Sequence, residues 1–348
     1  LGNKNSCYHI LMYLQLYIFM MQNVQTNSLR NWKYFINLSP VAFVLLGNLN
    51  GGWYTLSNFA FTFVVLALGE LLLPEDKSNE AGEDDVLPDL LLFLVVVGQL
   101  LALSSLIYGV YTQVLSGYWI LLAALSTGTA TGSMGIIAAH ELIHRKEKFW
   151  NFLGRFLLFT VLNPYFYVHH LRIHHKSVGT AADPVSALKG ETVYAFAFRS
   201  IYGQLQQSLA LEKNRCNKAG RWGYGLHNYV VAVYAGGFLL LGALTYFFGI
   251  WVAVAFLLQA TVANLLLEYT NYIEHYGLRR NEKERVNELH SWQSDKVVSR
   301  YFLIDLSRHS DHHFHAVKPF NTLVSYENSP VLPGGYASMF LPALFPPL

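Results

Sequence analysis

Long apolar segments constrain the fold of this chain more than any other feature of its sequence. An α-helix of about 20 predominantly apolar residues spans a bilayer, and inside the bilayer only helices and closed barrels satisfy every backbone polar group. Segments of this kind occupy residues 34–49, 53–73, 88–112, 118–139, 225–248 and 250–272. Short turns rich in small residues join them in pairs. The sequence therefore predicts an all-α integral membrane protein with six transmembrane helices in three hairpins.

Basic residues predict how these helices are oriented. Clusters of lysine and arginine precede the first apolar segment, follow the fourth and follow the sixth: Arg30 and Lys33, then Arg145, Lys146 and Lys148, then Arg279, Arg280, Lys283 and Arg285. Because an even number of crossings separates the clusters, all of them lie on one side of the membrane. The positive-inside rule identifies that side as the cytosol, so in a bacterium the protein would lie in the inner membrane.

The composition excludes several functional classes. The two cysteines, Cys7 and Cys216, are far apart, so the sequence contains no disulfide framework, zinc ribbon or iron–sulfur motif. The formal net charge is only +2, whereas a nucleic-acid-binding protein shows a concentrated basic face. We therefore expect no nucleic-acid partner.

Histidine is the residue type on which the functional interpretation depends. Nine of the 14 histidines fall into four short clusters next to apolar segments, where ionisable side chains are costly and usually functional. These nine are His140 and His144, His170, His174 and His175, His275, and His309, His312 and His313. Nine imidazoles are too many for one metal ion and suit two, although imidazole ligation by itself does not identify the metal.

Spacing within the clusters predicts how the ligands are shared. Residues four apart lie on one face of an α-helix, so His140 and His144 are expected to hold one ion together, and so are His170 and His174. The adjacent His174 and His175 point in different directions. That pair suits ligand sets divided between two neighbouring ions.

The other histidines have different interpretations. The spacing of the solitary His275 leaves metal ligation and ordinary packing equally open. His169 and His315 adjoin ligand clusters, and we expect them to surround the ligands rather than to bind metal. The isolated His9, His227 and His290 are expected to be packing residues.

Carboxylates near the clusters can orient imidazole N–H groups and offset the charge of bound cations. The candidates are Glu141, Asp183, Glu274, Asp305 and Asp311. Asp311 is the favoured one because it lies between His309 and His312.

The apolar stretch that follows residue 149 is not expected to cross the membrane. A crossing there would place His170 on the opposite side from His144 and separate the clusters. We therefore predict that region 149–224 lies at the membrane interface, with a helix break near Asn163-Pro164.

Three parts of the chain follow from this reasoning. Residues 1–33 form an N-terminal arm, either a targeting segment or a loosely held amphipathic arm. Residues 34–280 form the membrane domain, and residues 281–348 form a cytosolic cap that completes the metal site. Together they make one functional domain.

The ordered histidine motifs resemble a known family. HELIHRK, HHLRIHH, NYIEHYGL and LSRHSDHHFH, in this order after hydrophobic hairpins, are similar to those of the membrane alkane 1-monooxygenases, the non-haem di-iron alkane ω-hydroxylases. The resemblance implies two iron ions held by the nine clustered histidines, His275 included. It also implies O₂-dependent terminal hydroxylation of medium-chain alkanes, or similar alkyl and methyl groups, to primary alcohols. The implied partners are a rubredoxin-type electron donor with its reductase, and membrane lipid.

The chain departs from the family pattern in its second motif. His169 stands where the family commonly has an acidic residue, and Leu171 and Ile173 stand where Asn and Gly are frequent. These differences leave open whether the substrate is an alkane, an aromatic methyl group or an acyl chain. A membrane fatty-acyl desaturase or hydroxylase is the nearest alternative function, and a non-enzymatic metal or haem carrier is the alternative from another class.

Overall fold

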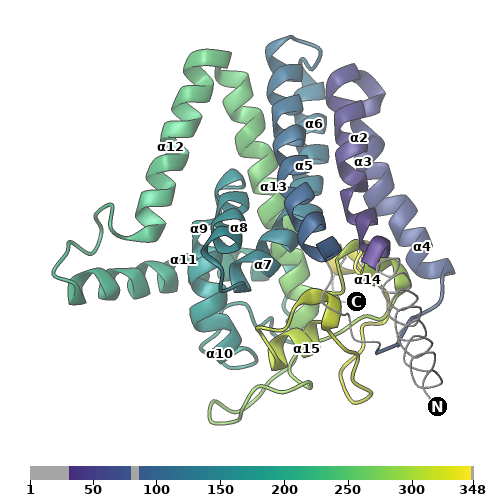
Figure 1. Cartoon of the computed structure of the whole chain (residues 1–348), viewed down its shortest axis with the longest axis vertical. Helices are drawn as coiled ribbons and strands as arrows, with labels where there is room; N and C mark the ends of the chain where they lie inside the picture. The colour runs from purple at the N-terminus through teal and green to yellow at the C-terminus, as the bar shows by residue number, and fades with distance from the viewer. Residues whose placement is uncertain (1–30, 80–85, 346–348) are drawn as a thin grey trace, which may run out of the picture.

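Helices make up the fold (Figure 1). The computed structural model describes residues 31–79 and 86–345. Within these ranges no β-strand forms, and isolated bridges alone join Glu75 to Lys296 and Gln293 to Val331. The all-α prediction is therefore confirmed for this part of the chain. Residues 1–30 of the predicted N-terminal arm, His9 among them, lie outside the described residues.

Five helical stretches are long and apolar enough to cross a membrane: Gly52–Leu72, Val86–Tyr111, Tyr118–His144, Tyr229–Phe248 and Ile250–His275. The first contains α3 (Ser57–Ala60) and α4 (Leu66–Leu72), and the third contains α6 (Tyr118–Ala130) and α7 (Ile137–His144). The others are α5, α12 and α13. Each stretch coincides with a predicted apolar segment, so the prediction of a multi-pass membrane protein is confirmed for these five.

The first predicted segment, 34–49, differs from the other five. It begins as a 3₁₀-helix at Trp32–Leu38 and continues as α2, Ser39–Asn50. The buried amides Asn37 and Asn48 lie within it, and it is not among the helices of membrane-spanning length and apolarity. The structure thus supports five spans. The count of six spans in three hairpins is not confirmed.

The helix α13 is the central element of the bundle, in contact with α5, α6, α11 and α12. Its close approach to α6 depends on a missing side chain, because a Cβ atom at Gly128 would lie 2.6 Å from the backbone oxygen of Gln259. The last turn of α13 carries Glu274 and His275, both buried. This helix therefore delivers one histidine cluster to the end of the bundle.

The region between the fourth and fifth apolar segments contains a helix break at Asn163-Pro164, as predicted. α8 (Lys148–Thr160) is followed by a break, and α9 (Pro164–His169) starts at the proline. Asn163 caps α9, because its side-chain oxygen accepts a hydrogen bond from the backbone N–H of Phe166 at 3.1 Å. The 26-residue α11 (Val193–Lys218) runs across the direction of the long helices (Figure 1), the orientation expected of a helix lying in a membrane interface.

The segment after α13 folds over one end of the bundle (Figure 1). Its short helices are α14 (Val297–Phe302), α15 (His309–Phe314) and α16 (Phe340–Leu344). A buried ionic network holds α14 and α15 in place. Arg300 bonds to Asp305 at 2.7 Å, and Arg308 lies 3.4 Å from Asp295 and donates to the Leu323 carbonyl at 2.8 Å.

Candidate metal centre

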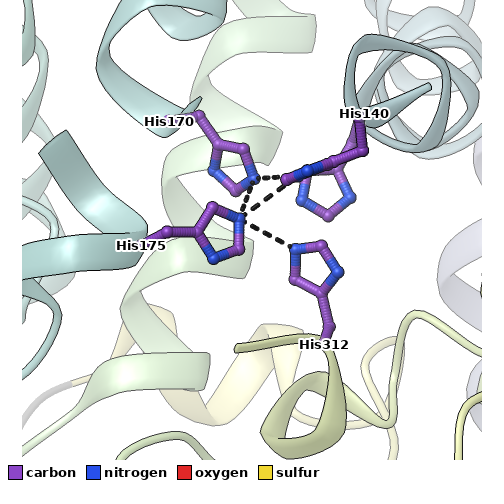
Figure 2. A group of neighbouring side chains, drawn as sticks. His140, His170, His175 and His312 are labelled. Carbon is purple, nitrogen blue, oxygen red and sulfur yellow. Dashed lines mark hydrogen bonds between the residues drawn. The ribbon is translucent and has the colours of Figure 1, made fainter. Parts of the chain in front are cut away.

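The structure brings all nine clustered histidines together at one end of the bundle. They form two groups, and within each group the ring nitrogens lie within 4.8 Å of one another. The five-histidine group contains His140, His144, His170, His175 and His312, and the four-histidine group contains His174, His275, His309 and His313. Figure 2 shows part of the first group, with rings from α7, from the turn after α9 and from α15 turned toward one another.

Distances in the five-histidine group fit ligation of a shared ion. His175 Nε2 lies 2.9 Å from His170 Nε2 and 3.2 Å from both His144 Nε2 and His312 Nε2. An imidazole nitrogen binds a divalent ion such as zinc at about 2.0–2.1 Å, which places two neighbouring ligands of one ion roughly 2.9–3.4 Å apart. The nitrogens are therefore arranged as ligands of one ion would be.

The ring nitrogens of the four-histidine group are separated by similar distances. His313 Nε2 lies 2.9 Å from His309 Nε2 and 3.2 Å from His174 Nε2. His275 Nε2 is buried and has no hydrogen-bond partner among the described residues. A buried donor or acceptor without a partner is costly, so this nitrogen fits a metal ligand better than a packing residue. His275, which its spacing left open, thus joins a histidine group.

The partition corrects one expectation about spacing. His140 and His144 share a group as predicted, and the adjacent His174 and His175 are divided as predicted. His170 and His174 were expected to pair, but His170 instead shares its group with His175. The cause is a π-helical turn at His170–His174. Its i→i+5 hydrogen bonding widens the helix, so residues five apart share a face, and such turns are frequent at functional sites.

Electrostatics favour the neutral form of these imidazoles. Burial lowers the pKa of His170, His175 and His312, and the neighbouring imidazoles lower the pKa further. The same two causes lower the pKa of His309 and His313. Neutral imidazole is the form that binds metal, so this donor set suits cations of the kind that imidazole prefers.

Two of the five candidate carboxylates reach a clustered histidine. Asp183 Oδ2 lies 3.0 Å from His174 Nδ1, and Ser186 donates to the same oxygen at 2.7 Å. Burial alone would raise the pKa of Asp183, but the adjacent His174 holds that pKa well below its usual range. Glu274 Oε2 lies 3.2 Å from His309 Nε2.

The other three carboxylates have different partners, which corrects the expectation for each of them. Glu141 accepts a hydrogen bond from Arg145 at 2.9 Å, and Asp305 pairs with Arg300. Asp311 was favoured, yet its carboxylate bonds to His315 at 2.8 Å and also to Lys318. The reason is helical geometry, because in α15 the residue between His309 and His312 points away from the face that these two share.

The other histidines among the described residues lie outside both groups. His169 is buried and its Nε2 lies 3.0 Å from Gln207 Oε1. His290 lies 3.4 Å from Glu284, and the side chain of His227 is exposed. Sequence reasoning missed Tyr336, whose hydroxyl donates to Glu274 Oε1 at 2.8 Å. Only its place in the motif LPGGYASM could have drawn attention to it.

Two small cavities adjoin the histidines. A cavity of about 30 Å³ is lined by four of the clustered histidines, by the polar side chains of Thr270, Asn271 and Glu274, and by apolar side chains; the histidines are His140, His170, His174 and His309. A second, of about 50 Å³, lies toward the membrane helices between Leu66 of α4 and Leu266 of α13. Ile137 and Thr270 line both cavities, so they form the wall between them.

Membrane-spanning helices end at the five-histidine and four-histidine groups. This arrangement defines an integral membrane protein built around a metal site. The comparisons with known proteins specify the class further. A sequence model of the fatty acid desaturase family matches residues 116–342. Alkane 1-monooxygenase 1 of Pseudomonas aeruginosa is 36% identical over 310 residues, which cover 83% of this chain and 81% of the relative. Alkane 1-monooxygenase 2 of Alcanivorax borkumensis is 32% identical, with 94% and 90% covered.

The chain therefore belongs to the alkane 1-monooxygenases, membrane oxidoreductases within the fatty acid desaturase family. A more distant relative is the hydroxylase component of a xylene/toluene monooxygenase from Pseudomonas putida. It is 23% identical over 319 residues, which cover 91% of this chain and 86% of the relative.

Proposed function

We propose that this protein hydroxylates the terminal carbon of medium-chain alkanes, or of similar alkyl or methyl groups, to give primary alcohols. Two iron ions would support the reaction, one held by each histidine group. One atom of O₂ enters the C–H bond and the other leaves as water, which consumes two electrons and two protons. The observation that carries the proposal is the partition of nine imidazoles into two adjacent groups.

Iron is proposed because the reaction needs a redox metal. Imidazole ligands suit zinc, copper, iron and nickel, and zinc has no redox chemistry. Bound iron would supply the activation of O₂, and the chain supplies the ligands and their environment. Asp183 keeps the His174 ring oriented through Nδ1, which leaves Nε2 of that ring free to bind metal.

The cavity between α4 and α13 is proposed to receive the alkyl chain. Its lining combines apolar side chains such as Leu66, Leu266 and Phe302 with polar ones such as Glu70 and Ser133. The apolar part can bind hydrocarbon and exclude water. Its volume of about 50 Å³ is far below the roughly 300 Å³ at which typical ligand pockets begin. Entry of a chain therefore requires the side chains at the Ile137–Thr270 wall to move, and that movement would join this cavity to the one beside the histidines.

Electrons are proposed to come from a rubredoxin-type donor with its reductase. A rubredoxin-type site needs four thiolates, and the sequence has two cysteines. The donor would approach the end of the bundle that carries the histidines. Basic residues gather at that end, where Lys33 lies over the Tyr301 ring, Arg145 follows α7 and Arg279 follows α13. From the positive-inside rule we infer that this end faces the cytosol.

Metal analysis combined with a product assay tests the proposal. The detergent-purified protein is analysed for metals, and the same sample is supplied with octane, O₂ and reduced rubredoxin. We expect two irons per chain and formation of 1-octanol. Mainly zinc or copper, with no turnover after iron is restored, would instead indicate a metal carrier.

A fatty-acyl desaturase or hydroxylase is the second candidate, and the match to the desaturase family over residues 116–342 favours it. The same preparation is therefore assayed with acyl substrates. Two irons with a desaturated or hydroxylated acyl product, and no 1-octanol, would support this alternative and contradict alkane hydroxylation.

A further inference from the structure

Every polar atom of Tyr336 forms a hydrogen bond, and the three partners are three different residues. Its backbone N–H donates to Ser299 Oγ at 3.0 Å, and its carbonyl accepts from the Tyr269 hydroxyl at 2.6 Å. Its own hydroxyl donates to Glu274 Oε1 at 2.8 Å. The side chain is buried, so packing and these hydrogen bonds fix both its position and its rotamer.

The backbone around Tyr336 is also attached to a membrane helix. The Glu70 carboxylate of α4 accepts hydrogen bonds from the backbone N–H groups of Ala337 at 3.1 Å and Ser338 at 2.6 Å. This approach requires glycine at position 335, because a Cβ atom there would lie 2.2 Å from the carboxylate carbon of Glu70. A buried, fully bonded carboxylate inside a membrane helix is costly to keep without a role.

Glu274 is the residue that this arrangement orients. With Oε1 bound by Tyr336, Oε2 is the oxygen that faces His309, 3.2 Å from Nε2. That nitrogen is also the one that lies 2.9 Å from His313 Nε2. The carboxylate therefore faces the ligand side of the four-histidine group, not the back of the ring.

The charge of the site explains why this orientation matters. Neutral imidazoles contribute no negative charge to bound divalent cations, and an anionic oxygen directed at the cation side of the group offsets that charge. A carboxylate free to rotate about its terminal bond, a broad and roughly two-fold torsion, would not hold one oxygen there.

We propose that Tyr336 is a positioning residue that fixes the rotation of Glu274 and so sets the electrostatic environment of the metal in the four-histidine group. This inference rests on the proposed di-iron hydroxylation. The hydrogen bonds to Glu70 fix the backbone next to Tyr336 against the membrane helix α4. The ring of Tyr336 lines the cavity proposed for the alkyl chain. Tyr336 thus joins the substrate cavity to the metal environment.

The test compares Tyr336→Phe with Tyr272→Phe. Phenylalanine keeps the ring in the cavity wall and removes only the hydrogen bond to Glu274. Tyr272 is a matched control, since it is a mostly buried tyrosine on α13 whose hydroxyl donates to the Glu191 carbonyl at 2.7 Å and not to Glu274. Iron content, the Mössbauer spectrum of iron-57-loaded protein, and kcat and KM for octane are measured on each.

In Tyr336→Phe we expect unchanged iron content and KM, a changed spectrum for one of the two irons, and a kcat lowered about ten- to a hundredfold. Tyr272→Phe should match the wild type in all four readouts. A Tyr336→Phe protein with the wild-type spectrum and kcat would overturn the inference. Failure of the wild type itself to bind iron or form 1-octanol would instead count against the proposed function.

Glu274→Gln keeps the inference testable if Tyr336→Phe does not fold. It preserves the size of the side chain and removes the charge that Tyr336 is proposed to direct. We expect the same change in one iron spectrum, and the double variant with Tyr336→Phe should be no worse than Glu274→Gln alone. Wild-type kcat and spectrum in Glu274→Gln would show that there is no charge for Tyr336 to position.

Discussion

The imidazole of His174 is held between a carboxylate and a neighbouring histidine. Its Nδ1 lies 3.0 Å from Asp183 Oδ2, while its Nε2 lies 3.2 Å from His313 Nε2. Asp183 is completely enclosed and also accepts a hydrogen bond from Ser186. The ring therefore presents one nitrogen to the four-histidine group and cannot turn without breaking a charge-assisted hydrogen bond.

Replacement of Asp183 by Asn should weaken the four-histidine group. Asparagine cannot offer the anionic acceptor that orients His174, and loss of such an outer partner typically costs about 10- to 100-fold in metal affinity or activity. Iron titration followed by a hydroxylation assay would measure the effect. Asp89→Asn is the control, because Asp89 forms a partly exposed pair with Arg145 at 3.6 Å. Equal behaviour of the two variants would show that Asp183 is not part of the metal environment.

His312→Ala should remove about one metal equivalent and abolish hydroxylation. His312 Nε2 lies 3.2 Å from His175 Nε2 in the five-histidine group, so its loss opens that ligand set. Elemental analysis and product detection would measure both effects. His227→Ala serves as the control because that side chain is exposed and outside both groups. Full activity in His312→Ala, or metal loss in His227→Ala, would contradict the ligand assignment.

Metal removal should lower the thermal stability of the protein. The two groups join side chains from α7, the turn after α9, α13 and α15, so each bound ion would tie three segments together and the two ions four. A ligand that binds the native state alone stabilises it. We expect the Tm to fall in chelator-treated protein and to recover when Fe(II) is added. Thermal unfolding of the detergent-solubilised protein would measure both changes. A Tm independent of metal would show that the segments are held without it.

Gly128→Ala should destabilise the bundle. The added methyl group would lie 2.6 Å from the Gln259 carbonyl oxygen and 2.6 Å from Val262 Cβ, and overpacking of this kind costs about 1–3 kcal/mol. The free energy of unfolding would be compared with that of Gly242→Ala in α12, where no atom lies within 4 Å of the new Cβ. If both variants unfold alike, the α6–α13 contact is looser than the structure indicates.

Ser133→Leu should shift the substrate range toward shorter chains. Ser133 lines the cavity between α4 and α13, and its buried hydroxyl has no hydrogen-bond partner among the described residues. Leucine fills that space without removing a bond. We expect the ratio of long-chain to short-chain alcohol products to fall about tenfold, measured by chromatography over a series of alkanes. An unchanged ratio would place the alkyl chain elsewhere.

Local periodicity accounts for what could be predicted about the fold. Runs of apolar residues mark helices that must lie in a bilayer, and five of them appear with nearly the predicted bounds. The stretch 34–49 could not be settled in this way, because the side-chain N–H groups of its buried Asn37 and Asn48 donate to partners inside the bundle. Asn37 donates to the Phe302 carbonyl at 2.7 Å and Asn48 donates to Ser105 at 3.0 Å. Such partners lie far away in the sequence, where no local pattern can show them.

The candidate site shows the same division between local and distant information. Eight of the nine histidines could be chosen from the sequence pattern, because so many ionisable side chains beside apolar segments are costly unless they have a function such as metal binding. His275 was indicated only by the resemblance to a known family. Their partition could not be read with α-helical spacing, since the π-turn changes which residues share a face. The sequence could not show which carboxylates contact the histidines either. Asp305 faces Arg300 and Glu274 faces His309, although both are close to histidines in the sequence.

The sequence by itself determined the class of fold and the residue type that can bind metal. It specifies a helical membrane protein and the imidazoles that can bind metal, because apolar length and ligand type are properties of short segments. Tertiary structure alone decided which histidines share a group, that Asp183 and Glu274 rather than Asp311 accompany them, and that Tyr336 holds Glu274. These contacts join distant segments, such as those of His174 and His313, which lie 139 residues apart. They depend on how helices pack and on where one turn widens, and neither is encoded in local spacing.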